Sequence, residues 1–150
     1  MKLRTLGREG LTVSAIGYGA MGTATGYGPS DDTESIAAIR RAFELGTTHF
    51  DTARMYGWGE GEKLLGAAVA PFRDEITIAT KFGIESDPAR GFVPDSRPGH
   101  IRKVVDDSLR VELLGDPIEL EIGHDAVSAN DQINARPRGS SAWSTPRASR

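Results

Sequence analysis

Three residues whose types could transfer a proton lie within a short stretch of the chain: Asp51, Tyr56 and Lys81. A phenol is a weak acid with an ordinary pKa of about 10, but a nearby ammonium group favours the ionised phenol and so eases proton donation. A carboxylate that pairs with the ammonium would hold it in place. The three residues therefore predict a proton-donating group. The alternatives are a structural ion pair between Asp51 and Lys81, and an ordinary exposed aromatic at Tyr56.

Alternating strands and helices are expected to position these residues. Asp51 and Lys81 each end a predicted strand, which is where barrel enzymes place their chemistry. Short β-prone runs on either side of a turn predict an initial hairpin, and the β-α-β-α order that follows predicts a parallel sheet, either open or closed as a barrel. The hairpin is expected at 3–6 and 11–15, strands at 16–19, 47–51, 75–81 and 118–122, helices at about 32–46, 60–69 and 98–114, and a loop at 88–98.

The length of the chain limits this fold to part of a barrel. At 150 residues it fits one domain, whereas an eight-fold β/α barrel usually needs about 250 residues. If the sheet closes as a barrel, the predicted fold class is α/β, a partial (β/α)8 TIM barrel with four β/α units after the N-terminal hairpin; the alternative is an open, doubly wound sheet. Residues 1–124 form this part. Residues 125–150 are rich in Ser and Arg and lack apolar periodicity, so they are expected to be a disordered tail.

The overall composition excludes several partners. The formal net charge is −3 and the pI is about 5.6, with charges of mixed sign, so nucleic acid is not expected to bind. Cysteine is absent, which excludes disulfides and thiolate metal sites and fits a reducing compartment. No signal peptide or membrane-spanning run is visible. We therefore expect a cytoplasmic protein that does not contact the membrane.

Three glycines after the first parallel strand match a dinucleotide-binding pattern literally. Gly17, Gly19 and Gly22 give G-x-G-x-x-G, but residues 23–29 after them have loop chemistry. In a dinucleotide-binding unit the third glycine lies in the opening helix, whose N-terminus holds the phosphate. A Rossmann-type dehydrogenase is thus disfavoured. We instead expect the glycines to let a strand end approach a flat ligand closely.

Each of the three histidines has a functional and a structural interpretation. His124 follows the fourth predicted strand, where a neutral imidazole could hydrogen-bond a substrate carbonyl, or it could simply begin the tail. His49 and Asp51 could suggest a metal pair, but no second group of ligands accompanies them, so His49 is interpreted as a packed strand residue and no metal site is predicted. His100 is expected to face solvent.

Several motifs together resemble one enzyme family. The motifs are Leu6-Gly7-Arg8-Glu9-Gly10-Leu11-Thr12-Val13-Ser14, Gly17-Tyr18-Gly19-Ala20-Met21-Gly22, Phe50-Asp51-Thr52-Ala53-Arg54-Met55-Tyr56-Gly57, Glu60-Gly61-Glu62-Lys63-Leu64-Leu65-Gly66 and Ile78-Ala79-Thr80-Lys81-Phe82-Gly83. In this order they resemble the aldo-keto reductases, from about residue 2 to residue 124. The resemblance implies a (β/α)8 barrel that reduces an aldehyde or ketone with NADPH.

The same resemblance implies roles for individual residues. Tyr56 would give a proton to the carbonyl oxygen, Lys81 would ease that donation, and Asp51 would orient Lys81 and contact the nicotinamide ribose. His124 would align the carbonyl.

Two further residues match positions that line the nicotinamide side of the family's site. These are Ala20 and Met21, and Met21 is also expected to face the substrate. The partner would be a small carbonyl compound whose identity, like the oligomeric state, the sequence does not specify.

The sequence also departs from the family. Residues 108–116 carry an extra residue relative to the family's pattern, and Pro117 and Glu121 are unusual in a strand buried on both faces. Strands five to eight, with the loops that bind the cofactor's phosphates, have no counterpart. We therefore expect a truncated or frame-shifted product that binds NADPH weakly and shows little reductase activity. The alternatives are a non-catalytic, cofactor-bound regulatory subunit of the same fold, and a non-functional gene fragment.

Overall fold

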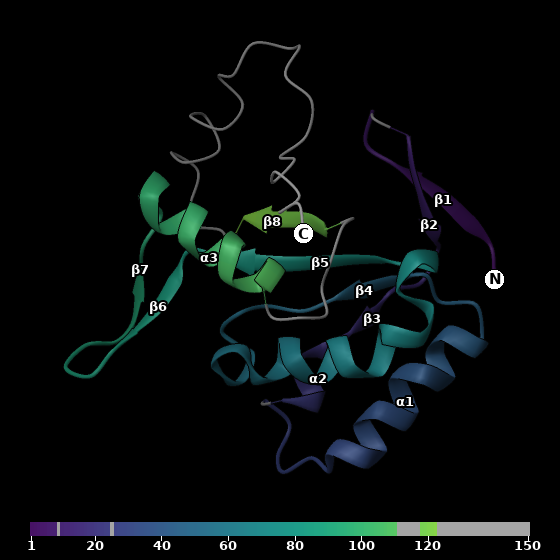
Figure 1. Cartoon of the computed structure of the whole chain (residues 1–150), viewed down its shortest axis with the longest axis horizontal. Helices are drawn as coiled ribbons and strands as arrows, with labels where there is room; N and C mark the ends of the chain where they lie inside the picture. The colour runs from purple at the N-terminus through teal and green to yellow at the C-terminus, as the bar shows by residue number, and fades with distance from the viewer. Residues whose placement is uncertain (9, 25, 111–117, 123–150) are drawn as a thin grey trace, which may run out of the picture.

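Four parallel strands form the central sheet. The computed structural model describes residues 1–8, 10–24, 26–110 and 118–122. The strands are β3 (Tyr18–Gly19), β4 (His49–Asp51), β5 (Thr77–Phe82) and β8 (Ile118–Ile122), in the spatial order β3-β4-β5-β8. Each neighbouring pair is parallel, so the carboxyl ends of all four strands lie at one edge of the sheet (Figure 1). This edge can collect polar side chains from several strands.

Helices α1 (Asp32–Glu44) and α2 (Glu60–Val69) lie on the same side of the sheet (Figure 1). They enclose a core in which Phe50 of β4 and Ile78 of β5 pack with Ile39 and Leu65, all fully buried. Burying side chains of this size contributes about 1.5 to 3 kcal/mol each. The α/β alternation thus follows from strands that are apolar on the face the helices cover.

The ends of the helices are set by local chemistry. The Asp31 carboxylate accepts a hydrogen bond of 2.9 Å from the backbone N–H of Glu34 and caps α1, a contact that contributes about 1 kcal/mol. Helix α2 has the predicted bounds. Helix α3 (Pro98–Arg110) begins where predicted, and the predicted continuation to 114 lies outside the described residues, as does the whole of 125–150. Short 3₁₀ helices cover Ala20–Thr23, Tyr56–Gly59 and Ala70–Glu75.

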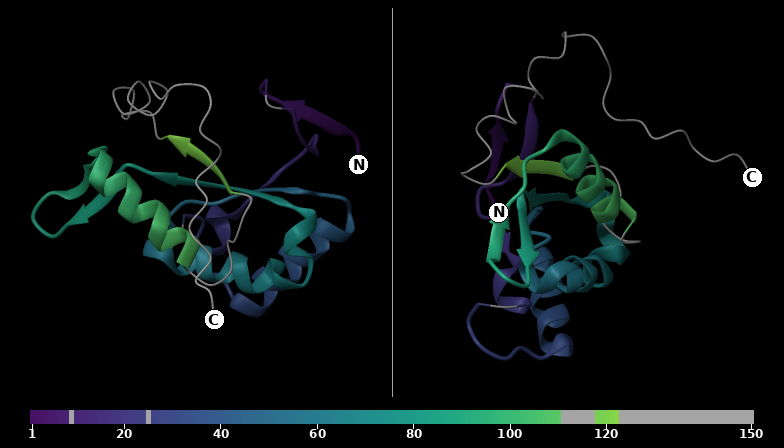
Figure 2. Two further views of the ribbon diagram at one scale, coloured as in Figure 1. Left: turned by 45° about the horizontal axis from the view of Figure 1, so that its top comes forward. Right: turned by 90° about the vertical axis from the view of Figure 1, so that its left-hand side faces the viewer.

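Two antiparallel hairpins lie at opposite ends of the sheet (Figure 2). The first pairs β1 (Leu3–Leu6) with β2 (Leu11–Ser14), and the backbone N–H of Ser14 donates to Thr48 Oγ1 at 2.9 Å, just before β4. The second pairs β6 (Ile84–Asp87) with β7 (Gly91–Pro94) and directly follows β5. It therefore extends from the carboxyl edge of the sheet.

The predicted loop over 88–98 is wrong for residues 91–94, which form strand β7. The reason is a tight turn that the sequence analysis did not recognise. The Asp87 carboxylate accepts hydrogen bonds from the backbone N–H groups of Ala89 and Arg90, at 2.8 and 2.9 Å, and Gly91 has a φ of 74°. An aspartate that bonds to backbone two and three residues later, followed by a left-handed glycine, closes a turn and lets the two flanking segments pair.

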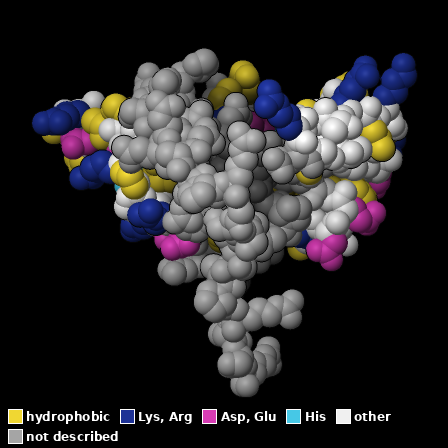
Figure 3. Space-filling view, turned by 90° about the horizontal axis from the view of Figure 1, so that it is seen from above, with side chains coloured by type: hydrophobic (Ala, Val, Ile, Leu, Met, Phe, Trp, Pro, Cys, Tyr) yellow, Lys and Arg dark blue, Asp and Glu magenta, His cyan; other side chains and the backbone are white. Residues whose placement is uncertain are grey.

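Lys and Arg side chains and Asp and Glu side chains are both visible among the described residues in the view of Figure 3. Within the described part of the chain, no helix has the length and apolar character needed to cross a membrane.

Candidate active site

Asp51 and Lys81 meet at the carboxyl edge of the sheet. Lys81 Nζ lies 2.5 Å from Asp51 Oδ1 and donates a second hydrogen bond of 2.9 Å to the carbonyl oxygen of Thr52. The two side chains are 26% and 31% exposed, so the pair is half-buried and open to solvent on one side. A charge-assisted contact of this kind fixes the ammonium while leaving it within reach of a ligand.

The register of β4 and β5 produces this meeting. Asp51 is the neighbour of Ala79 in the ladder, and Lys81 stands two residues further along β5. Side chains two residues apart in a strand share a face, so both groups extend from the same face of the sheet. The backbone N–H of Thr52 continues the ladder to the Ala79 carbonyl at 2.8 Å, which fixes the segment that leaves β4.

Tyr56 lies beside the ion pair. Its ring centroid is 5.4 Å from Lys81 Nζ, within the range of a cation–π contact. The turn that carries it is closed by a hydrogen bond of 3.0 Å from the Tyr56 N–H to the Ala53 carbonyl. The structure thus brings together all three residues from which the sequence predicted a proton-donating group.

Gly61 also positions Tyr56, and the sequence analysis did not identify it. A Cβ at this position would lie 2.8 Å from the Tyr56 carbonyl oxygen and 2.9 Å from Ala24 Cβ. Any larger residue would therefore push the Tyr56 turn away from the start of α2. The signal available in the sequence was a glycine inside a predicted helix, which weakens the helix and so calls for a packing reason.

The first parallel strand ends beside Asp51. Gly19 and Asp51 are register partners in the β3–β4 ladder, and a Cβ added to Gly19 would meet no atom within 4 Å. The next two residues are Ala20, which is fully buried, and Met21, which is half-buried. Open space is thus present next to the Asp51 carboxylate, at the end of β3.

The other two glycines of the G-x-G-x-x-G pattern, Gly17 and Gly22, make room for side chains of this chain and not, as expected, for a ligand. A Cβ at Gly17 would lie 2.9 Å from Cδ2 of His49, and one at Gly22 would lie 3.1 Å from the ring of Tyr27. Two of the three glycines therefore make room for the chain's own rings. A 3₁₀ helix follows Gly19 in place of the α-helix that a dinucleotide fingerprint requires.

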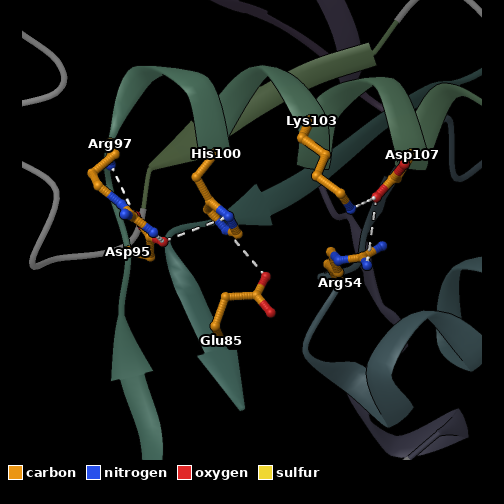
Figure 4. Close-up of polar contacts among 7 residues, drawn as sticks. All are labelled: Arg54, Glu85, Asp95, Arg97, His100, Lys103 and Asp107. Atoms are coloured by element: carbon orange, nitrogen blue, oxygen red, sulfur yellow. Dashed lines mark hydrogen bonds and ion pairs between the residues drawn. The ribbon is translucent and has the colours of Figure 1, made fainter. Parts of the chain in front are cut away.

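The histidines lie in three different situations. His124 lies outside the described residues. His49 is half-buried, and its Nδ1 atom is buried with no hydrogen-bond partner among the described residues. His100 was predicted to face solvent, and that prediction is wrong: its side chain is 16% exposed, with Nε2 3.1 Å from Glu85 Oε1 (Figure 4).

The surroundings of His100 explain the error. Hairpin β6–β7 folds back against the first turn of α3, which brings Asp95 Oδ2 to 3.6 Å from His100 Nδ1. Asp95 also pairs with Arg97 at 2.6 Å, and this hydrogen bond holds the pKa of the Asp95 carboxyl well below its ordinary value. The cluster joins the hairpin to the helix. Within the described residues, no group of three His, Cys, Asp or Glu could hold a metal ion.

A comparison with protein families finds a match to the "Aldo/keto reductase family" over residues 15–129. Among curated relatives, the chain is 39% identical to aldo-keto reductase yakc [NADP(+)] of Schizosaccharomyces pombe, covering 71% of this chain and 32% of the relative. It is 36% identical to L-galactose dehydrogenase of Arabidopsis thaliana, covering 89% of this chain and 41% of the relative. The chain thus spans about a third to two fifths of the length of these relatives.

Solved structures give the same result. The chain is similar to aldo-keto reductase AKR11C1 from Bacillus halodurans in its holo form, with a TM-score of 0.76 and 31% identity, over 89% of this chain and 44% of that one. It is also similar to a Pseudomonas aeruginosa structure described as the putative aldo-keto reductase PA4992, with a TM-score of 0.72 and 29% identity, over 88% and 55% of the two chains. The arrangement of strands and helices described here is thus shared with solved proteins of that kind.

Proposed function

Because the chain belongs to the aldo/keto reductase family, we propose that it forms the first four units of a (β/α)8 barrel and carries the proton-donating part of a reductase site. The reaction is the NADPH-dependent reduction of an aldehyde or ketone to an alcohol. The observation that carries the proposal is Lys81 Nζ, which contacts Asp51 at 2.5 Å and lies 5.4 Å from the Tyr56 ring centroid.

Each of the three residues has one task in this reaction. The Tyr56 hydroxyl donates its proton to the carbonyl oxygen as the alcohol forms. The Lys81 ammonium stabilises the phenolate that is left, because an adjacent positive charge favours the ionised form. Asp51 holds the ammonium against the Tyr56 ring, and the Thr52 carbonyl fixes it from a second direction at 2.9 Å. A purely structural ion pair would not need a phenol beside it.

The chain's own residues fit one end of a nicotinamide cofactor. The open space at Gly19 borders the Asp51 carboxylate, which suits a ribose hydroxyl, and Ala20 and Met21 follow directly. We assign Ala20, Met21 and Asp51 to this end of NADPH. When bound, NADPH supplies the hydride for the carbonyl carbon. We keep His124 as the residue that aligns the carbonyl, on the basis of its position after β8 in the sequence.

The proposal is tested by product formation. Purified protein is incubated at high concentration with NADPH and 4-nitrobenzaldehyde, and 4-nitrobenzyl alcohol is measured by chromatography. We expect slow formation of the alcohol, because the chain spans less than half of the relatives' length, and a loss of at least about 100-fold in Tyr56→Phe. Tyr27→Phe is the matched control, since Tyr27 is 82% exposed. Absence of alcohol from the unmodified protein, or equal formation by Tyr56→Phe, would contradict the proposal.

A further inference from the structure

A pair of opposite charges joins the segment before Tyr56 to helix α3. Arg54 Nη2 lies 3.7 Å from Asp107 Oδ2, and the two side chains are 25% and 28% exposed (Figure 4). Arg54 stands three residues after Asp51 and two before Tyr56. It therefore belongs to the segment that connects two residues of the candidate active site, although it is not itself part of the proton-donating group.

The turn that carries Tyr56 contains Arg54. The Tyr56 N–H donates to the Ala53 carbonyl at 3.0 Å, and Arg54 and Met55 are the two residues inside the turn that this bond closes. A contact that fixes the Arg54 side chain thus restricts the conformations of the turn. The direction in which the Tyr56 side chain leaves the backbone is restricted with it.

Helix α3 provides a firm support for this contact. Ser108, the residue after Asp107, is 1% exposed, and its hydroxyl donates to Glu62 Oε1 of α2 at 2.9 Å. Asp107 Oδ2 also accepts a hydrogen bond of 2.7 Å from Lys103, one turn earlier in α3. The carboxylate near Arg54 is thus held by its own helix, and this helix is anchored to α2.

Charge, and not a hydrogen bond, forms the link to Arg54. A separation of 3.7 Å is longer than a hydrogen bond, and Arg54 Nε is buried with no hydrogen-bond partner among the described residues. Asp107 Oδ2 is shared between Lys103 at 2.7 Å and Arg54 at 3.7 Å. Because both cations attract the same oxygen, removing the Lys103 charge should strengthen the link to Arg54.

We propose that Arg54 is a positioning residue: its ion pair with Asp107 ties the turn that carries Tyr56 to α3 and so keeps the phenol beside Lys81. This inference rests on the proposed function, in which Tyr56 donates the proton. Misplacing a reacting group by about 1 Å can reduce a rate by about 100-fold, so a small rotation of the turn is enough to affect proton transfer.

Hydrogen exchange of backbone amides, followed by NMR in the whole chain, tests the inference without any turnover. Arg54→Gln and Asp107→Asn are each expected to accelerate exchange of the Tyr56 N–H about fivefold, and the double variant should add little more, because either change removes the same pair. The Thr52 N–H, which bonds to β5 at 2.8 Å, should keep its rate. Equal acceleration at both amides would mean a general loss of stability and would overturn the inference.

Three further variants separate positioning from a merely structural role. Arg54→Lys keeps the charge and should return the exchange rate of the Tyr56 N–H to within about twofold of the unmodified protein. Lys103→Met should slow this exchange or leave it unchanged. Arg41→Gln is the matched control, because Arg41 pairs with Glu44 at the exposed surface. Failure of Arg54→Lys to restore the rate, or acceleration in Lys103→Met equal to that in Arg54→Gln, would contradict the proposed pair.

Alcohol formation then distinguishes this inference from the reductase proposal. In Arg54→Gln, kcat for 4-nitrobenzaldehyde should fall about tenfold while KM stays within about twofold, because the change acts on proton donation by Tyr56. A loss confined to KM would overturn the positioning role. Faster exchange of the Tyr56 N–H in Arg54→Gln, without any alcohol from the unmodified protein, would support the link to α3 and refute the reductase reaction. Unchanged exchange would overturn the inference whether or not alcohol is formed.

Discussion

Thr80 and Lys81 are neighbours on β5, yet they belong to two polar networks on opposite faces of the sheet. Thr80 Oγ1 donates to Glu62 Oε1 at 2.7 Å, and Ser108 Oγ donates to the same oxygen at 2.9 Å. The exposed fractions of these residues are 2% for Thr80, 0% for Glu62 and 1% for Ser108. On the other face, Lys81 and Asp51 keep 26% and 31% of their side chains exposed.

This difference separates a closed network from one that is open to a ligand. The carboxylate of Glu62 joins α2, β5 and α3, because its two hydroxyl donors come from the other two elements. No ligand can reach it. The pair of Lys81 and Asp51 is equally polar, but it is open to solvent and adjoins a phenol. Burial, and not residue type, therefore distinguishes the network that solvent and ligands can reach from the one that they cannot.

The largest effect on stability is expected from Glu62→Ala. The change removes the acceptor of two buried hydroxyl groups and leaves a cavity, so the free energy of unfolding should fall by about 3 kcal/mol. Urea denaturation followed by circular dichroism measures it. Glu60→Ala is the matched control on the same helix, because Glu60 pairs with Lys63 at the exposed surface, where the expected change is below about 1 kcal/mol.

A triple variant distinguishes the loss of buried hydrogen bonds from the loss of packing in Glu62→Ala. Glu62→Leu, Thr80→Val and Ser108→Ala together replace the whole network by apolar groups, so no buried donor is left without an acceptor, and most of the lost stability should return. If the triple variant is as unstable as the sum of its parts, the loss in Glu62→Ala comes from packing rather than from the hydrogen bonds.

Lys81→Met is expected to reduce alcohol formation strongly but to leave stability nearly unchanged. Removing the ammonium that adjoins Tyr56 is expected to reduce alcohol formation by at least about 100-fold, which corresponds to about 2.7 kcal/mol of transition-state stabilisation. The free energy of unfolding should change by less than about 1 kcal/mol, because the pair is solvent-accessible. Lys63→Met, at an exposed pair, is the control. A stability loss equal to that of Glu62→Ala would make Lys81 a structural residue and remove the contrast between the faces.

Thr80→Val tests whether the two faces act independently. The variant keeps the shape and strand preference of the side chain but removes one buried hydrogen bond, so the free energy of unfolding should fall by about 1 to 2 kcal/mol. Thr5→Val on exposed strand β1 gives the baseline. Alcohol formation by the folded Thr80→Val protein should stay within about threefold of the unmodified protein. A loss comparable to that of Lys81→Met would show that the buried face controls the position of Lys81.

Much of this architecture could be predicted because it depends on periodicity. The alternation of strands and helices, the bounds of α2 and the placement of Asp51 and Lys81 at strand ends all follow from local apolar patterns. The meeting of Asp51 with Lys81 then requires only that β4 and β5 be neighbours. The burial of Glu62 could also have been predicted, because Glu62, Leu65 and Val69 share one helical face. The charge of the Glu62 side chain instead favoured a position facing solvent.

What could not be predicted depends on contacts distant in sequence or on single turns. The solvent-facing assignment of His100 failed because a hairpin, itself unrecognised, folds over the first turn of α3. Gly17 and Gly61 are explained by rings and backbone from other elements, which no local pattern contains. The contact between Trp58 and Phe92 likewise arises only when the 3₁₀ helix at Tyr56–Gly59 and strand β7 are placed side by side.

The smallest effect on stability is expected from a change at Asp95, which pairs with Arg97 two residues later. The hydrogen bond from Arg97 lowers the pKa of Asp95 in the folded protein, so its contribution to stability is present above the unfolded pKa of about 3.9 and is lost as the pH falls below that value. The melting temperature of Asp95→Asn should therefore lie slightly below that of the unmodified protein at pH 7, and the difference should shrink by pH 3. Asp74→Asn, at an exposed carboxylate, gives the baseline for removing one charge. A difference that grows as the pH falls would contradict the assignment of this contribution to the pair of Asp95 with Arg97, and would place hairpin β6–β7 under the control of a longer-range contact rather than a local pair.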